Sequence, residues 1–338
     1  MKRIQLANRA FEGRNDVYLL PGEPTVLVDA GIATDAGRDA LRAGLAEAGL
    51  AVEDVDEVLV THWHYDHTGL AGEIQAESGA TVRAHAADAP LVAGDEAAVA
   101  DEAARTRRRL DEWGLPHGPR EELLDFFDTH EDIRGTPCEV TPFDGGDVLD
   151  LGERSFEVVH LPGHAAGLSA FETAGETLDS DAPGRHAFVG DAILPKYTPN
   201  VGGADVRVED PLATYAESLV EVVERDWARA WPGHRDPIDD PAGRAREILA
   251  HHRERTERVV SVLDEHGPCD AWTVSAHLFG DLSDIHILHG PGEAFAHLDH
   301  LASAGVVECD EGGAESGGHR YALVEAEPDV AALFPATE

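Results

Sequence analysis

The sequence predicts an α+β protein in which a larger domain is followed by a smaller, mostly helical one. Short apolar strands alternate with helical segments over residues 1–85, and strand patterns return between 147 and 191. The C-terminal part instead reads as three helices followed by a hairpin. Because 338 residues is long for a single domain, we expect one domain at 1–248 and a second at 249–338.

The first elements lead up to a buried strand. Residues 16–20 and 25–29 alternate as two strands across a Pro-Gly turn, and 35–49 form an amphipathic helix that ends at a glycine. The next strand is 58–60, Val-Leu-Val. Further elements are expected at 69–79 (helix) and at 80–85, 147–151, 154–159 and 187–191 (strands).

The segment directly after this strand carries the strongest functional signal. Residues 61–69 read Thr-His-Trp-His-Tyr-Asp-His-Thr-Gly. His62 and His64 are two apart, so in an extended segment their imidazoles point to the same side. Asp66 and His67 follow where the chain turns into a helix, and they can face a second position nearby. A solvated loop is the alternative in a chain with 19 histidines, but this spacing behind a strand favours a metal site.

A charged, helical segment follows at about 95–135. Two helices joined around 114–116, Gly-Leu-Pro, would suit a cap over a cleft. The arginine cluster at 105–109 has two interpretations: ion pairs with acids such as Asp101 and Glu112, or an anion-collecting patch in a negative protein. We favour the ion pairs, because charge runs are weak functional signals.

The histidine segment is similar to a known family motif. Residues 61–69 resemble the THxHxDHxG metal motif of the metallo-β-lactamase superfamily of hydrolases. The resemblance implies an αββα sandwich for the larger domain. The C-terminal pattern resembles the winged-helix-like domain of the lactamase-B-2-like branch. Gly69 is followed by Leu70, where many relatives carry a second glycine; this departure alters local packing and leaves the motif residues intact.

The resemblance also implies further ligands, each in a short segment behind a strand. His164 ends a His-Leu-Pro-Gly-His segment, Asp191 ends Phe-Val-Gly-Asp, and His234 ends Trp-Pro-Gly-His. Each segment is common by itself, and their order along the chain matches the family. By resemblance the first ion would be held by His62, His64 and His164, the second by Asp66, His67 and His234, with Asp191 between them.

The implied ligands suit particular cofactors. Five neutral imidazoles and two carboxylates suit two Zn²⁺ ions, with Fe or Mn where metal availability decides. Two such ions can share a water and lower its pKa, so the resemblance implies a metal-bridging hydroxide as the nucleophile. Asp191 would set the distance between the ions. Asp66, being a ligand, would accept a proton only late in the reaction.

Two other segments are candidates for supporting roles. The Asp29-Ala30-Gly31 turn resembles one that the family places beneath the metal site, so Asp29 either orients a metal-bound histidine or is an ordinary turn residue. Lys196 and Tyr197 lie in a stretch that enters the cleft in similar hydrolases, which makes them candidates for substrate binding. A surface salt bridge would account for Lys196 equally well.

Acidic residues dominate the whole chain. Asp and Glu number 66 against 26 Lys and Arg, a formal net charge of -40. Because 42% of the residues are apolar and periodic, we expect a folded protein adapted to the high-salt cytosol of a halophile. The charge argues against nucleic-acid binding. Three widely spaced cysteines indicate no disulfide framework. The sequence shows no apolar stretch of signal-peptide or membrane-span length, which favours a cytoplasmic protein without a membrane partner.

The C-terminal pattern invites a DNA-binding interpretation, which we reject. The third helix, expected at 293–304, carries Glu293 and Asp299 and has no basic face. A buttress for the cleft, or a homodimer surface, is expected instead. The histidines of this part that we expect not to bind metal are His251, His252, His286, His289 and His300.

The ligands do not encode the substrate. Our first expectation is a small molecule with a thioester or related acyl ester, as in glyoxalase-II-like hydrolases. The second is a phosphodiesterase or endoribonuclease of the lactamase-B-2-like type. A non-catalytic winged-helix interaction protein with a structural metal site is a third class, which seven ligands with room for water argue against. We expect no antibiotic lactamase, because the sequence shows no export signal.

Overall fold

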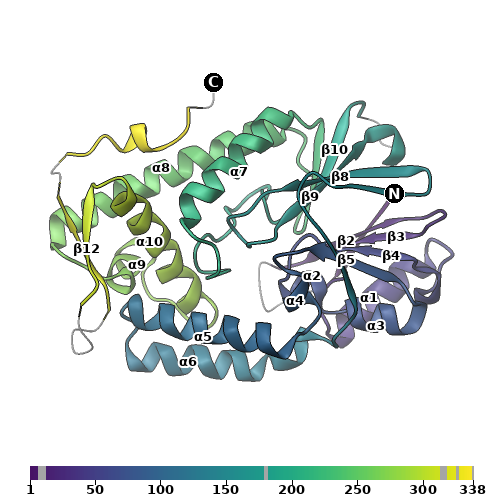
Figure 1. Ribbon diagram of the computed structural model, residues 1–338, viewed down its shortest axis with the longest axis horizontal. Coiled ribbons are helices and arrows are strands. Elements are labelled where there is room, and N and C mark those ends of the chain that lie inside the picture. Colours follow the sequence, from purple (N-terminus) through teal and green to yellow (C-terminus); the bar gives the residue numbers. More distant parts are fainter. Residues whose placement is uncertain (7–12, 179–181, 313–317, 325–326, 337–338) are drawn as a thin grey trace.

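The larger part of the molecule is a sandwich of two mixed β-sheets (Figure 1). The computed structural model describes residues 1–6, 13–178, 182–312, 318–324 and 327–336. The first sheet, in the order β1-β2-β3-β4-β5-β6, consists of β1 Lys2–Leu6, β2 Asn15–Leu20, β3 Val26–Val28, β4 Glu57–Leu59, β5 Thr81–His85 and β6 Val140–Phe143. The second, in the order β11-β10-β9-β8-β7, consists of β7 Val148–Leu151, β8 Arg154–His160, β9 Ser169–Ala174, β10 Arg185–Gly190 and β11 Arg229–Pro232.

Helices cover the sandwich and build the remainder of the molecule. They are α1 Asp35–Ala46, α2 Tyr65–Thr68, α3 Ala71–Ser78, α4 Ala89–Val92, α5 Glu96–Glu112, α6 His117–Thr129, α7 Pro211–Arg225, α8 Pro241–His266, α9 Ala271–Phe279 and α10 His286–Ser303. Short 3-10 helices lie at Val52–Asp54, Glu131–Arg134, Gly175–Leu178 and Val330–Leu333. A last hairpin joins β12 Val307–Asp310 to β13 Arg320–Leu323.

Strand residues alternate between two apolar cores, which confirms the predicted αββα sandwich. Leu59 packs with Phe156 and Phe188 in the core between the sheets. Val58 and Val60 instead belong to the core beneath the outer helices α1, α3 and α7. Successive side chains of a strand point to opposite faces. Both faces are covered here, which is why residues 58–60 read as one apolar run.

Some elements differ from the sequence prediction. The patterns do not predict β1, β6, β9 or α7. The third C-terminal helix, α10, begins at His286, so its predicted start at 293 was wrong. The run Gly290-Pro291-Gly292 lies inside this helix. Because glycine and proline are the weakest helix formers, the sequence pattern does not predict the first turns of α10.

One long helix connects the sandwich to the C-terminal elements. Residues 241–266 form α8, which is about 39 Å long at 1.5 Å per residue. Ala245 and Ile248 pack into the core beneath the second sheet. Val259 and Leu263, further along the helix, pack into the C-terminal core. The boundary predicted at 248 therefore lies inside a continuous helix.

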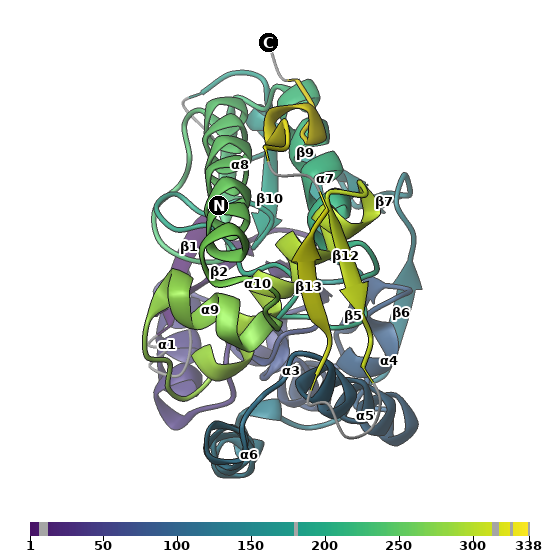
Figure 2. The same ribbon diagram turned by 90° about the vertical axis from the view of Figure 1, so that its left-hand side faces the viewer.

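The two helices at 95–135 share a core with the C-terminal elements. Leu110, Trp113 and Leu123 of this cap pack in the same cluster as Val274 and Leu298. The backbones are also joined, since the N–H of residue 272 donates to the Trp113 carbonyl at 2.9 Å. Figure 2 shows α5 and α6 running beneath α9, α10 and the β12–β13 hairpin. The cap and the C-terminal elements therefore form one structural unit.

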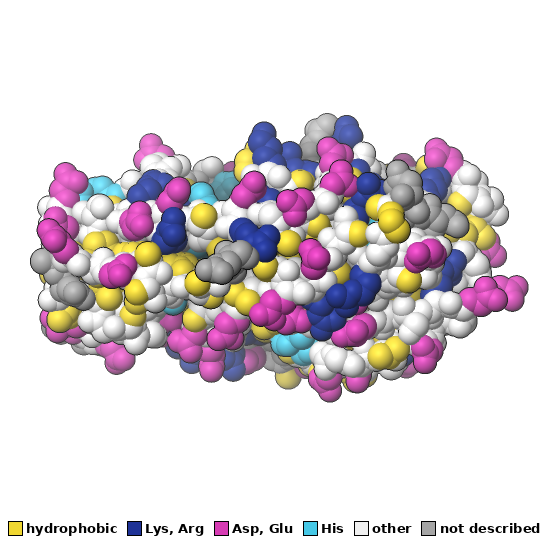
Figure 3. Space-filling view, turned by 90° about the horizontal axis from the view of Figure 1, so that it is seen from above, with side chains coloured by type: hydrophobic (Ala, Val, Ile, Leu, Met, Phe, Trp, Pro, Cys, Tyr) yellow, Lys and Arg dark blue, Asp and Glu magenta, His cyan; other side chains and the backbone are white. Residues whose placement is uncertain are grey.

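Acidic side chains are spread over the surface. Figure 3 shows them over one face, with arginine and lysine side chains between them. In the arginine cluster, Arg105 pairs with Asp101 at 2.7 Å and Arg109 with Glu112 at 2.8 Å, which confirms the ion pairs that we favoured for these two arginines. Within the described residues, no helix is both long and apolar enough to span a membrane.

Candidate metal centre

The seven predicted ligand residues lie together at one edge of the sandwich. They follow the C-terminal ends of β4, β8, β10 and β11. They form three overlapping groups, each with ligand atoms within 4.8 Å of one another: His62 with His64 and His164, His62 with His67 and Asp191, and Asp66 with His67 and His234. Asp191 lies between the two predicted sets. Its Oδ2 is 3.7 Å from His164 Nε2 and 3.4 Å from His234 Nε2.

Backbone carbonyls orient two of the histidines. His64 Nε2 lies 2.9 Å from the Ala204 oxygen, and His164 Nδ1 lies 2.8 Å from the Asn200 oxygen. A carbonyl oxygen only accepts, so these contacts assign the single N–H of each neutral ring. His64 Nδ1 and His164 Nε2 then direct lone pairs at each other across 3.1 Å. Two such lone pairs repel unless they share a cation.

A chain of hydrogen bonds beneath the site assigns the protons of two more histidines. The Thr61 hydroxyl donates to Asp29 at 3.0 Å, so its oxygen accepts from His62 Nδ1 at 3.1 Å. Asp29 also accepts from His67 Nδ1 at 2.9 Å. Both rings therefore turn their Nε2 atoms toward the centre. This geometry favours the interpretation of Asp29 as a residue that orients a metal-binding histidine.

The second set is held by the start of β2. His234 Nδ1 lies 3.1 Å from the Arg14 carbonyl oxygen, and its Nε2 lies 3.3 Å from Asp66 Oδ2. Asn15 donates its side-chain N–H to the same Asp66 oxygen at 3.0 Å. No sequence pattern indicates a function for Arg14 or Asn15, because neither belongs to a recognisable motif.

Buried atoms without partners mark the centre of the cluster. His62 Nε2, His67 Nε2 and Asp191 Oδ1 are buried and have no hydrogen-bond partner among the described residues. Buried polar atoms are nearly always paired. Burial alone would lower the pKa of His67, but the carboxylates around it, Asp66 first, raise it to about 9. The negative charge of these carboxylates, which favours a proton on His67, also favours a divalent cation at the same position. The residues therefore fit a metal site.

A buried ion-pair group, which no sequence motif indicates, fixes the ligand loops. Arg207 Nη2 contacts Asp88 at 2.6 Å and Asp205 at 2.5 Å. Asp88 accepts from the backbone N–H of Trp63 at 3.1 Å and of Gly167 at 3.0 Å. Asp205 accepts from the Trp63 indole N–H at 3.0 Å. Trp63 lies between two ligand histidines, and Gly167 lies three residues after a third, so the ion pairs hold both loops at once.

Gly233 lies so close to the centre that a methyl group there should disturb it. A Cβ at this position would lie 2.4 Å from His67 Cε1 and 2.7 Å from Asp191 Oδ1. The Gly233 backbone cannot retreat easily, because its N–H and carbonyl are both in 2.8 Å hydrogen bonds to neighbouring strands. We expect Gly233→Ala to weaken metal binding about 10- to 100-fold, as does the loss of residues that hold metal ligands in position.

A metal titration against a chromophoric chelator measures this effect. The matched control is Gly118→Ala on α6, where an added Cβ has no atom within 4 Å among the described residues. Gly118→Ala should bind metal like the wild type. Equal metal affinity in Gly233→Ala would show that the ligand positions are not those described.

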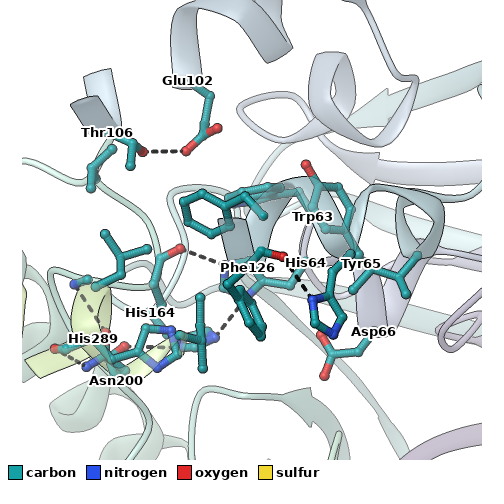
Figure 4. Close-up of a pocket in the computed structure, with 18 of the residues that line it drawn as sticks. Trp63, His64, Tyr65, Asp66, Glu102, Thr106, Phe126, His164, Asn200 and His289 are labelled. Atoms are coloured by element: carbon teal, nitrogen blue, oxygen red, sulfur yellow. Dashed lines mark hydrogen bonds between the residues drawn. The ribbon is translucent and has the colours of Figure 1, made fainter. Parts of the chain in front are cut away.

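The centre opens into a cavity of about 260 Å³ (Figure 4). Its walls come from α5, α6, α10 and the loop after β10. Apolar side chains make up much of the lining, among them Trp63, Leu110, Leu124, Phe126, Val206 and Leu288. Figure 4 also shows the Thr106 hydroxyl donating to Glu102 at 2.7 Å in the cavity wall. The predicted cap therefore faces the metal centre.

Among the described residues that line this cavity, neither Lys196 nor Tyr197 is included. Tyr197 is 45% exposed. Lys196 Nζ lies 5.3 Å from its ring centroid, and Arg235 lies over the same ring at 4.6 Å. Leu194 and Asn200, on either side of this pair, do line the cavity. A role for Lys196 and Tyr197 in substrate binding stays a prediction.

A second buried group has the composition of a metal site but not its electrostatics. His252, Glu293 and His297 place ligand atoms within 4.8 Å of one another between α8 and α10. The Arg255 guanidinium contacts the same Glu293 carboxylate, and the Thr256 hydroxyl lies 2.7 Å from His297 Nδ1. A positive charge already occupies this position, so we assign no metal to the group.

Known proteins share this fold. Residues 10–234 match the family model described as the metallo-beta-lactamase superfamily. The probable metallo-hydrolase YqjP of Bacillus subtilis is 29% identical over 84% of this chain and 86% of its own length. The structure of a metallo-beta-lactamase family protein from Thermus thermophilus matches with a TM-score of 0.77 and 30% identity, over 95% of this chain and 98% of that one. A beta-lactamase domain protein from Burkholderia ambifaria matches with a TM-score of 0.75 and 25% identity, over 95% and 91%.

Proposed function

Because the chain belongs to the metallo-beta-lactamase superfamily, we propose that it is a binuclear metal-dependent hydrolase of a small acyl ester, with a thioester as the first candidate. The hydrolase class is supported by the similarity to a probable metallo-hydrolase over most of both chains. The metal centre is supported by five imidazoles and two buried carboxylates whose ligand atoms form groups within 4.8 Å, and by the lack of a hydrogen-bond partner for three of these buried atoms among the described residues.

Each ligand residue has a proposed place in this centre. One ion would be held by His62, His64 and His164, the other by Asp66, His67 and His234, with Asp191 between them. Two divalent cations, zinc first and iron or manganese as alternatives, would lower the pKa of a water and polarise the carbonyl under attack. Asp66 is fixed by Asn15 and is not free to move as a base. Trp63 and residues of the cap helices line the cavity beside these ligands.

The apolar cavity wall is the observation that favours an acyl ester. Much of the surface that surrounds the cavity beside the metal centre is apolar. Leu124, Phe126 and Leu288 would bury an apolar acyl part, whereas a phosphodiester would leave these side chains without a partner. Arg107 and Arg134 also line the cavity, and they are the feature that favours the alternative, a phosphodiesterase or endoribonuclease.

A substrate panel combined with metal analysis tests the proposal. The panel holds an acetyl thioester, an octanoyl thioester, a lactone, a bis-aryl phosphodiester and a short RNA, all assayed with one purified sample. We expect about two metal ions per chain and thioester hydrolysis at least about tenfold faster than phosphodiester hydrolysis. Faster cleavage of the phosphodiester or RNA would select the alternative. Bound metal without hydrolysis of any substrate would indicate a structural site in an interaction protein.

We also propose that the protein is adapted to a salt-rich cytosol. The formal net charge of -40 on 36.2 kDa makes surface carboxylates repel one another, and the Debye length falls from about 10 Å at 0.1 M to about 3 Å at 1 M salt. The melting temperature should therefore rise as potassium chloride increases to molar concentration. Thermal melts with metal saturated throughout measure this. A melting temperature that is flat, or highest in dilute buffer, would contradict the adaptation.

A further inference from the structure

The loop between β10 and α7 carries two of the backbone oxygens that orient metal-site histidines. Asn200 accepts from His164, and Ala204 accepts from His64. These contacts decide which nitrogen of each ring is unprotonated and where it points. The position of this loop therefore sets the position of two of the predicted ligands.

Helix α10 of the C-terminal unit holds this loop through one carboxylate. Glu293 Oε2 accepts from the Asn200 side-chain amide at 3.0 Å and from the Val201 backbone N–H at 3.1 Å. The same Asn200 amide lies 3.0 Å from the His289 carbonyl oxygen, one turn earlier on α10. Figure 4 shows His289 and Asn200 beside His164. A hydrogen-bonded path thus runs from Glu293 through Asn200 to a metal-site histidine.

Glycines let the loop and the helix meet backbone to backbone. A Cβ on Gly292 would lie 2.2 Å from the Gly203 Cα, and one on Gly202 would lie 2.5 Å from the Gly292 carbonyl oxygen. A side chain at these positions would push the loop away from α10. This close contact with the loop explains why the run Gly290-Pro291-Gly292 occurs in α10, although it is unfavourable for a helix.

Glu293 is itself fixed from the opposite side. It is 4% exposed, and Arg255 on α8 contacts its other carboxylate oxygen. Burial opposes ionisation, but Arg255 and two neighbouring histidines hold the pKa of Glu293 well below its usual range. The carboxylate is therefore a charged, rigid acceptor, which makes stronger hydrogen bonds than a neutral group.

We propose that Glu293 is a positioning residue of the metal centre, and that α10 completes this centre from outside the sandwich. Glu293 fixes Asn200, and the Asn200 carbonyl oxygen then fixes the tautomer and orientation of His164. This inference rests on the proposed metal site and requires no particular substrate. The histidines of the sandwich supply the ligands, and the C-terminal unit holds one side of them in place.

The test compares metal binding in Glu293→Gln with the wild type. Glutamine keeps the size of the side chain but replaces a charged acceptor with a neutral amide. We expect zinc affinity to fall about 10- to 100-fold, as it does for other residues that orient metal ligands. The visible absorption spectrum of the Co²⁺-substituted protein should also change, because it reports the arrangement of the ligands.

Leu298→Ala is the matched control. Leu298 is a fully buried α10 residue in the C-terminal core. This variant should lower the melting temperature yet keep wild-type zinc affinity and Co²⁺ spectrum well below that temperature. If Glu293→Gln does not fold, Asn200→Ala decides, because it removes the side-chain link and keeps the carbonyl oxygen. Wild-type affinity and spectrum in the folded variant, or equal losses in Leu298→Ala, would overturn the proposal. Absence of metal from the wild type would instead refute the metal centre itself.

Discussion

Replacing Asp191 with alanine should reduce turnover at least about 10²-fold while the fold is kept. The carboxylate of Asp191 lies 3.7 Å from both His67 and His164, and 3.4 Å from His234, so it contacts both ligand sets. Losing a group that only orients a metal ligand already costs about 10- to 100-fold in affinity or activity. Losing the group between the two sets should cost at least as much. Removing a buried carboxylate leaves the sheets and their cores untouched, so circular dichroism should not change.

Steady-state kinetics and elemental analysis of the same sample measure this effect. Asp39→Ala, on the exposed side of α1, is the control for removal of one negative charge and should match the wild type. Loss of both the metal and the circular dichroism signal in Asp191→Ala would indicate a structural role. Wild-type turnover would show that Asp191 does not lie between two functional ions.

The ligands could be predicted because coordination chemistry restricts residue types and strand ends bring them together. His62, His64, Asp66 and His67 come from one loop, so their spacing alone indicates a site. His164, Asp191 and His234 required the order of short segments behind strands, which came from the family resemblance. The structure places all seven at the same edge of the sandwich.

The residues that hold the ligands could not be predicted, because they act across long stretches of chain. Asp88 binds Gly167 across 79 positions and Arg207 across 119, and Glu293 binds Val201 across 92. Each is a common residue in a chain with 66 acids, so no local spacing distinguishes it. Only the fold shows that these carboxylates are buried and paired.

The domain division was hard to place for a related physical reason. Local patterns mark where helices start and stop, but they do not show which core a helix packs into. The cap at 95–135 lies in sequence between β5 and β6 of the first sheet, yet Leu110, Trp113 and Leu123 pack into the C-terminal core. A helix that continues through residue 248 then joins both cores.

Deleting residues 249–338 should therefore unfold the cap and abolish soluble, active protein. Leu110, Trp113 and Leu123 are each 1% exposed or less, and the deletion would bare them. Burial of one large apolar side chain contributes about 1.5–3 kcal/mol, so these three alone contribute about 5 to 9 kcal/mol. Total stability of a domain is only about 5–15 kcal/mol. The same deletion cuts α8 and removes Glu293, so the Asn200 loop beside the metal centre would lose its support.

Soluble yield, gel filtration and metal content of the truncated chain measure this loss. Deleting only 327–338 is the control. It removes the last 3-10 helix, which packs on α8, but keeps α9 and α10, so it should stay soluble and bind metal. A chain ending at 248 that is soluble, monomeric and fully active would show that the C-terminal unit is an independent passenger. That result would contradict the shared core, because the cap would then fold without the C-terminal residues it packs against. It would also contradict the role of α10 at the metal centre, because the centre would then function without α10.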